Sequence, residues 1–173
     1  MVNVGGGCFL LLARKNENPP TYLSCEYNHF IQFKSEDNCE TWSEQGTTTF
    51  EDPPPSPPPT RYDAPPWLSF INYEGVGIVA CYYTNRYLQL LKVIFCLAKD
   101  LLEGPDDWNN SPIKEVHNYN GTVMSGYQSF FLPLNKYQGI GVCFKENGSN
   151  CAYPIIVFTK IEGMTDVLIA LGL

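Results

Sequence analysis

The sequence predicts an α+β fold, in which a mostly antiparallel β-sheet packs on one long central helix, with a short C-terminal helix and a proline-rich surface strap. Three patterns indicate this class: an apolar segment between capping signals at 84–105, alternating apolar and polar residues at 22–34, and a proline run at 53–66. The 173 residues suit a single domain, 1–173, because a chain of this length can bury one sizeable core.

The central helix is predicted between Thr84 and Pro105. Thr84 or Asn85 can cap its N-terminus through a side-chain oxygen, and Gly104 before Pro105 is a helix stop signal. One narrow polar stripe recurs at helical spacing: Asn85, Gln89, Lys92, Lys99 and Glu103. Because almost every other position is apolar, we expect the helix to be buried on most of its circumference. Charged residues interrupt the segment before it reaches the length of a membrane span, so no membrane partner is expected.

The two segments before the arm are predicted to pair as antiparallel strands. Val2–Ala13 is a glycine-led apolar run, which is typical of a strand buried on both faces. In Tyr22–Lys34 the apolar residues fall mainly at odd-numbered positions such as Ile31 and Phe33, and polar residues such as Gln32 lie between them. This period of two predicts a half-buried strand whose odd-numbered face turns toward the core.

Residues 35–66 are predicted to form an arm that is first acidic and then rich in proline. Ser35–Asp52 has no sustained apolar period, whereas Pro53–Pro66 favours polyproline II and could span about 40 Å. Proline-rich segments dock on aromatic surfaces because they lose little entropy on binding, so the arm is a candidate contact with neighbouring protein subunits. The candidate partner-binding residues are Pro54, Pro55, Pro57, Pro58, Tyr62 and Trp67.

Beyond the arm, strand composition returns on both sides of the predicted helix. Trp67–Tyr83 reads as strand, and its two glycines, Gly75 and Gly77, indicate a bulge or a close backbone approach. Pro105–Gly121 is rich in Asp, Asn and Pro and is predicted to be a loop.

The C-terminal third is predicted to be a three-stranded meander followed by a short helix. Its strands are Thr122–Leu132, Gln138–Lys145 and Cys151–Ile161, and Asn147-Gly148 is a turn signal between the last two. The final helix is indicated by apolar residues at i, i+3, i+4 and i+7, namely Met164, Val167, Leu168 and Leu171.

Charge and the N-terminal residues narrow the class of protein. Eighteen acidic residues against 11 basic ones give a net charge of −7, and no basic patch is visible, so no nucleic-acid partner is expected. The first seven residues carry no basic n-region, which predicts synthesis in the cytosol without a signal peptide. In that compartment the seven cysteines are expected to be small, reduced, apolar residues.

The sequence shows no pattern for a catalytic, cofactor-binding or metal-binding site, so no such residue is assigned. A thiol enzyme would need a cysteine such as Cys81 or Cys143 beside His117, and the spacing gives no sign of that pair. The cysteines are too dispersed for a zinc site. Cys143 and Cys151 flank the predicted turn and are a candidate disulfide, with reduced thiols as the alternative.

The leading functional hypothesis is therefore a non-catalytic structural or assembly protein, a subunit of an oligomer or a larger particle such as a virion. The alternative is a secreted or surface binding module with disulfides and with glycans on Asn120 and Asn147, which both fit the sequon. A thiol-dependent enzyme that uses His117 is the third hypothesis.

Overall fold

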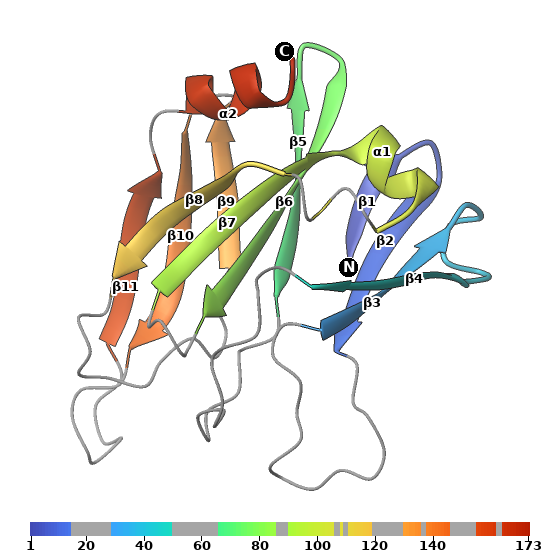
Figure 1. Cartoon of the computed structure of the whole chain (residues 1–173), viewed down its shortest axis with the longest axis horizontal. Helices are drawn as coiled ribbons and strands as arrows, with labels where there is room; N and C mark the ends of the chain where they lie inside the picture. Colours follow the sequence, from blue (N-terminus) through green and yellow to red (C-terminus); the bar gives the residue numbers. More distant parts are fainter. Residues whose placement is uncertain are drawn as a thin grey trace, which may run out of the picture.

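The computed structural model describes residues 1–14, 29–49, 66–85, 90–105, 108, 111–118, 130–135, 138–145, 155–161 and 164–173. Within these ranges the chain forms three antiparallel β-sheets and two short helices (Figure 1). The predicted α+β class, with a sheet packed on one long central helix, is therefore wrong: the described chain is mostly antiparallel β-sheet with only two short helices. The predicted antiparallel pairing of its strands is confirmed.

The N-terminal sheet has the strand order β1-β2-β3-β4. Its strands are β1 (Val2–Gly5), β2 (Cys8–Arg14), β3 (His29–Ser35) and β4 (Ser43–Thr49). The run predicted as one strand from residue 2 is a hairpin, because Gly5, Gly6 and Gly7 take positive φ angles of 97°, 61° and 81° and turn the chain. The predicted pairing of the next segment with the first is confirmed, since β3 lies antiparallel to β2.

The central sheet has the order β5-β6-β7-β8 and the C-terminal sheet the order β11-β10-β9. The central strands are β5 (Trp67–Tyr73), β6 (Val76–Asn85), β7 (Leu90–Leu97) and β8 (Ile113–Asn118). The C-terminal strands are β9 (Phe130–Asn135), β10 (Gln138–Lys145) and β11 (Ile155–Ile161). The order of the predicted meander is confirmed, but its first strand ends at Asn135 instead of Leu132, and the predicted residues 122–129 lie outside the described part of the chain. Strand β9 lies beside β5, and β11 lies beside β8 (Figure 1).

The segment predicted as one long helix is divided between two strands and a short helix. Thr84 and Asn85 end β6 instead of capping a helix, β7 follows, and only α1 (Ala98–Glu103) is helical. The segment lacks an amphipathic pattern because β7 is buried on both faces. Val93 and Phe95 enter one core cluster, and Ile94 and Cys96 enter the other. A strand buried on both faces is a continuous apolar run, which periodicity alone does not separate from a buried helix.

Two core clusters lie on opposite faces of the central sheet. Alternate residues of β6, such as Ile78 and Val79, enter different clusters. One cluster includes Leu10 and Phe30 of the N-terminal sheet. The other includes two side chains of α2 (Met164–Ala170), which runs across one end of the central and C-terminal sheets (Figure 1). The predicted short C-terminal helix is confirmed.

The stop signal and one glycine interpretation are also confirmed. Helix α1 ends at Glu103, directly before Gly104. A Cβ on Gly77 would lie 2.8 Å from Cε2 of Phe70 and 3.2 Å from Cβ of Ala98, so this position needs the close approach that only glycine permits.

Candidate protein–protein interface

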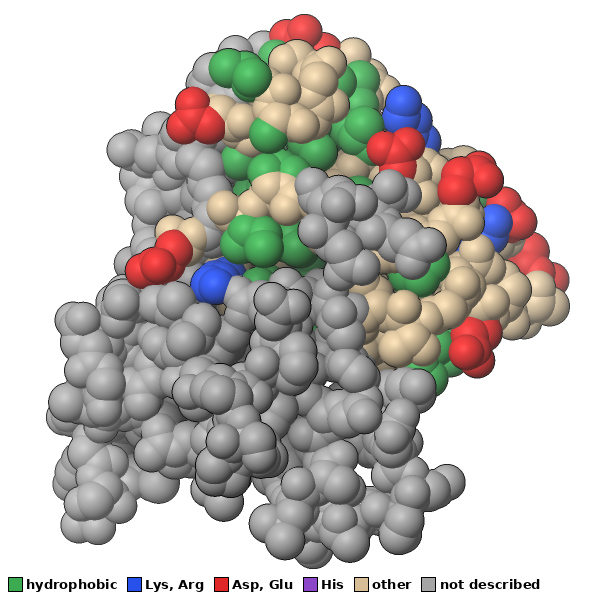
Figure 2. All heavy atoms as spheres, in the orientation of Figure 1, with side chains coloured by type: hydrophobic (Ala, Val, Ile, Leu, Met, Phe, Trp, Pro, Cys, Tyr) green, Lys and Arg blue, Asp and Glu red, His purple; other side chains and the backbone are tan. Residues whose placement is uncertain are grey.

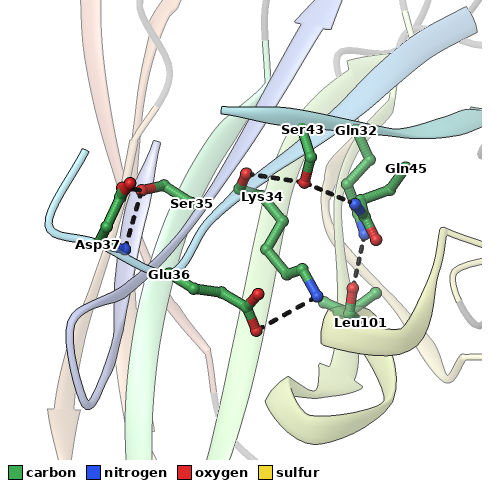
Figure 3. A network of polar contacts seen from close by, with 8 residues as sticks. All are labelled: Gln32, Lys34, Ser35, Glu36, Asp37, Ser43, Gln45 and Leu101. Atoms are coloured by element: carbon green, nitrogen blue, oxygen red, sulfur yellow. Dashed lines mark hydrogen bonds and ion pairs between the residues drawn. The ribbon is translucent and has the colours of Figure 1, made fainter. Parts of the chain in front are cut away.

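The burial of β3 is the reverse of the prediction. Phe30 and Gln32, at even-numbered positions, face the core, and Gln32 is only 1% exposed. Ile31 and Phe33, the predicted core residues, point to the opposite face of the sheet and are half-buried. The polar side chain is tolerated inside because both ends of its amide are hydrogen-bonded. Nε2 donates to the Leu101 carbonyl at 2.6 Å (Figure 3), and Oε1 accepts from Nε1 of Trp108 at 2.9 Å.

This arrangement leaves an apolar outer face on the N-terminal sheet, formed by Phe9, Leu11, Ala13, Ile31 and Phe33. The strand register places Leu11 opposite Phe33 and Ala13 opposite Ile31, so the two strands form one continuous patch. All five residues are half-buried, and none belongs to either core cluster. A contiguous apolar sheet face of this kind is typical of a surface that contacts another protein.

The two margins of the apolar outer face differ in charge. On the β4 side, the exposed residue Glu44 lies opposite Phe33. On the β1 side, the exposed residue Asn3 lies opposite Phe9 and is uncharged. The face is therefore apolar in the middle and acidic along one side.

The β3–β4 connection closes one end of the face with a compact polar network (Figure 3). The carboxylate of Asp37 accepts hydrogen bonds from the side chain and backbone N–H of Thr41 and from the hydroxyl of Ser35. These bonds, the one from the Thr41 side chain above all, lower the pKa of Asp37 from 3.8 to about 2. Nearby, Nζ of Lys34 lies 3.4 Å from the carboxylate of Glu36.

A second apolar area lies on α2. Its outward residue Ile169 is 68% exposed, and Leu173 just beyond the helix is also exposed. A shallow hollow beside this area, between α1 and α2, is lined by Cys96, Leu97, Asp100, Ser111, Pro112, Ala170 and Leu171. Apolar side chains are visible on this side of the molecule in Figure 2.

The proline-rich part of the predicted arm, 53–65, lies outside the described residues. Pro54, Pro55, Pro57, Pro58 and Tyr62 are among the residues left undescribed, and the arm's role stays a prediction. Trp67 is the first residue of β5 and is 50% exposed. Within 35–66, the structure adds β4, a strand that the acidic composition did not predict.

Four cysteines whose side chains the structure describes form no disulfide, and they fall into two groups. Cys81 and Cys96 are buried, and Cys8 and Cys39 are half-buried. Burial raises the pKa of the Cys81 thiol well above its ordinary value, which disfavours the reactive thiolate. Cys143 lies opposite Val157 in the β10–β11 ladder, and Cys151 is outside the described residues, so the candidate disulfide stays a prediction.

The central sheet keeps His117 away from Cys81. The strand β7 lies between them, and in the ladder Cys81 is level with Ile94, whereas His117 is level with Leu91 beyond a register shift. At ordinary sheet spacings the two backbones are roughly 10 Å apart across the strands and roughly 10 Å along them, because Leu91 and Ile94 are three residues apart. The sheet does not bring this pair together as a nucleophile and base.

Metal and membrane features were also sought in the described part of the chain. No three His, Cys, Asp or Glu side chains there are grouped to hold a metal ion. No helix there has both the length and the apolar character to cross a membrane.

No protein-family model matches the chain, and no similar protein was found among curated sequences.

The sequence carries a signal for the apolar outer face that periodicity alone does not resolve. Residues 8–13, CFLLLA, are apolar at every position, which predicts burial on both faces. The structure buries one of these faces in the core and leaves the other half-buried, on the outside of the sheet.

Proposed function

We propose that this chain is a non-catalytic structural protein that binds neighbouring protein subunits within a larger particle, such as a virion. The observation that carries the proposal is the apolar outer face, Phe9, Leu11, Ala13, Ile31 and Phe33, which lies outside both cores. The exposed side of α2 adds further apolar surface. Uncovered apolar patches are an aggregation liability, and a neighbouring subunit that covers them would remove it.

The buried polar contacts support a rigid presentation of this face. Gln32 fixes β3 against α1 and Trp108, directly beneath the outward side chains Ile31 and Phe33. Interfaces between subunits gain affinity when the contact residues are already ordered, because less entropy is lost on binding.

The test is the state of the chain purified from its natural source. We expect it to sediment as part of a complex much heavier than the single 19.5 kDa chain. Hydrogen exchange should be slower at 9–13 and 31–33 in that complex than in the isolated chain, because a neighbouring subunit covers these residues. A natural-source chain that sediments alone, with the same exchange as the isolated chain, would contradict the proposal.

A further inference from the structure

We propose that the apolar outer face packs against the same face of a second copy of the chain, about a two-fold axis that runs parallel to the strands between β2 and β3. The inference rests on the proposed function and names the first partner in the assembly. It follows from the register of the two strands and from the distribution of charge on the sheet.

The register makes the face complementary to itself in size. A two-fold rotation about this axis lays each β2 residue over the residue that opposes it on β3, now in the second copy. Leu11 then covers Phe33 of the second copy, and Ala13 covers Ile31 of the second copy. In both pairs a larger side chain meets a smaller one, so the two layers interdigitate in the way that packed sheets require.

The same rotation separates the acidic margins. Since the strand order is reversed between the copies, β4 lies over β1 of the second copy. Glu44 is level with Phe33 and Leu11, so it lies over Met1, the residue before β1 and two residues from Asn3, where neither side chain carries a charge. An axis perpendicular to the strands would instead place β4 over β4 and bring the two Glu44 carboxylates together. Repulsion between like charges thus selects the parallel axis.

The β3–β4 connection limits the contact surface at the Phe9 end of the face. The buried area is therefore small, which predicts a weak dimer. Ser35, opposite Phe9, is buried beside the β3–β4 connection and bonds to it through the backbone N–H of Cys39. The dimer contact is therefore centred on Leu11, Ala13, Ile31 and Phe33. Stable interfaces bury about 800 Å² on each partner, and a smaller patch fits a dissociation constant on the order of micromolar or weaker.

The experiment is sedimentation velocity of the isolated full chain over a series of concentrations. We expect a reversible monomer–dimer equilibrium, with Leu11→Glu raising the dissociation constant at least about tenfold because a carboxylate is buried in the contact. The matched control is Ile113→Glu, which places the same charge on an exposed apolar residue of β8 in the central sheet and leaves the equilibrium unchanged. Circular dichroism of each variant verifies that it is folded.

Disulfide trapping tests the orientation without a disruptive charge. In a background with Cys8→Ser and Cys39→Ser, a Leu11→Cys chain is mixed with a Phe33→Cys chain and oxidised. The mixed dimer should form faster than either self-pair, since the axis lays each position over the other. Self-pairing that equals mixed pairing would overturn the proposed axis.

The outcomes separate this inference from the proposed function. A chain that stays monomeric at all concentrations, or a dimer that Leu11→Glu does not weaken, overturns packing against a second copy. If the natural-source chain still sediments as a complex with residues 9–13 protected, a different subunit covers the face and the assembly role stands. If the natural-source chain is also free, both proposals fail.

Discussion

Gln32 shows how one buried amide can reverse the face that a strand presents. Its burial draws Phe30 into the core and turns Ile31 and Phe33 outward, although these two residues are more apolar than Gln32. Gln32 can be buried because its amide has hydrogen-bond partners in the core: Nε1–H of Trp108 donates to it, and the Leu101 carbonyl accepts from it. Neither partner is near Gln32 in the sequence, so the alternation of residues within β3 does not reveal that Gln32 is buried.

Replacing Gln32 with leucine should destabilise the fold strongly. The variant places an apolar side chain of similar size at position 32, but the Leu101 carbonyl and Nε1–H of Trp108 lose their hydrogen bonds to Gln32. Each unpartnered buried group costs about 1–3 kcal/mol, so the loss should be about 2–5 kcal/mol. Urea unfolding followed by tryptophan fluorescence measures it. Gln45→Leu is the control, because the bond from Gln45 to Ser43 is exposed, and it should change stability little.

Asp37 should make stability depend on pH in the acid range. Its pKa in the folded chain, about 2, lies below the ordinary 3.8, so folding favours the ionised form. This stabilisation is fully present above pH 3.8 and is lost as the pH falls from 3.8 toward 2. Unfolding midpoints measured across this window should fall less in Thr41→Val, which lacks the main hydrogen bond to the carboxylate. Thr47→Val, on an exposed threonine of β4, should behave as the unmodified chain does.

At the scale of elements, the strands with a clear local signal were predictable, whereas β7, β4 and β8 were not. The meander and the C-terminal helix follow from their turn signal and spacing, and the end of α1 follows from Gly104-Pro105. Strand β7 was read as helix because its burial on both faces depends on distant layers, namely Leu10 on one side and Val167 on the other. Strands β4 and β8 are polar and lie in segments that composition assigns to loops.

Gly77 is the position where the packing of elements leaves no room for a side chain. Gly77→Ala would press a methyl group against the Phe70 ring at 2.8 Å and Ala98 at 3.2 Å, where β5, β6 and α1 meet. Overpacking of this kind costs about 1–3 kcal/mol, which thermal or urea unfolding should detect. Gly104→Ala is the matched control, because its Cβ meets nothing within 4 Å and its φ of 168° is extended backbone. An equal loss in both variants would contradict the steric explanation.

For the whole molecule, the central sheet is the layer that both outer parts of the chain cover. The N-terminal sheet covers one of its faces, and α2 packs on the other. The candidate interface is thus the side of the N-terminal sheet that the central sheet does not use. The sequence suggests an assembly role, which stays a proposal, but it does not identify the candidate interface, because that requires knowing which face of β2 and β3 the core takes.

The C-terminal helix should therefore contribute to the stability of the whole fold, although it has only seven residues. Leu168 is 4% exposed and packs in a cluster with residues of β5, β6 and β7. Leu168→Ala opens a cavity there and should lower the free energy of unfolding by about 2–5 kcal/mol. Ile169→Ala, one residue along on the exposed side of α2, removes a similar volume and should change stability by less than about 0.5 kcal/mol. If unfolding curves for the two variants coincide, α2 is not part of the cooperative core, and the apolar surface beneath it has to be counted among the candidate contact surfaces.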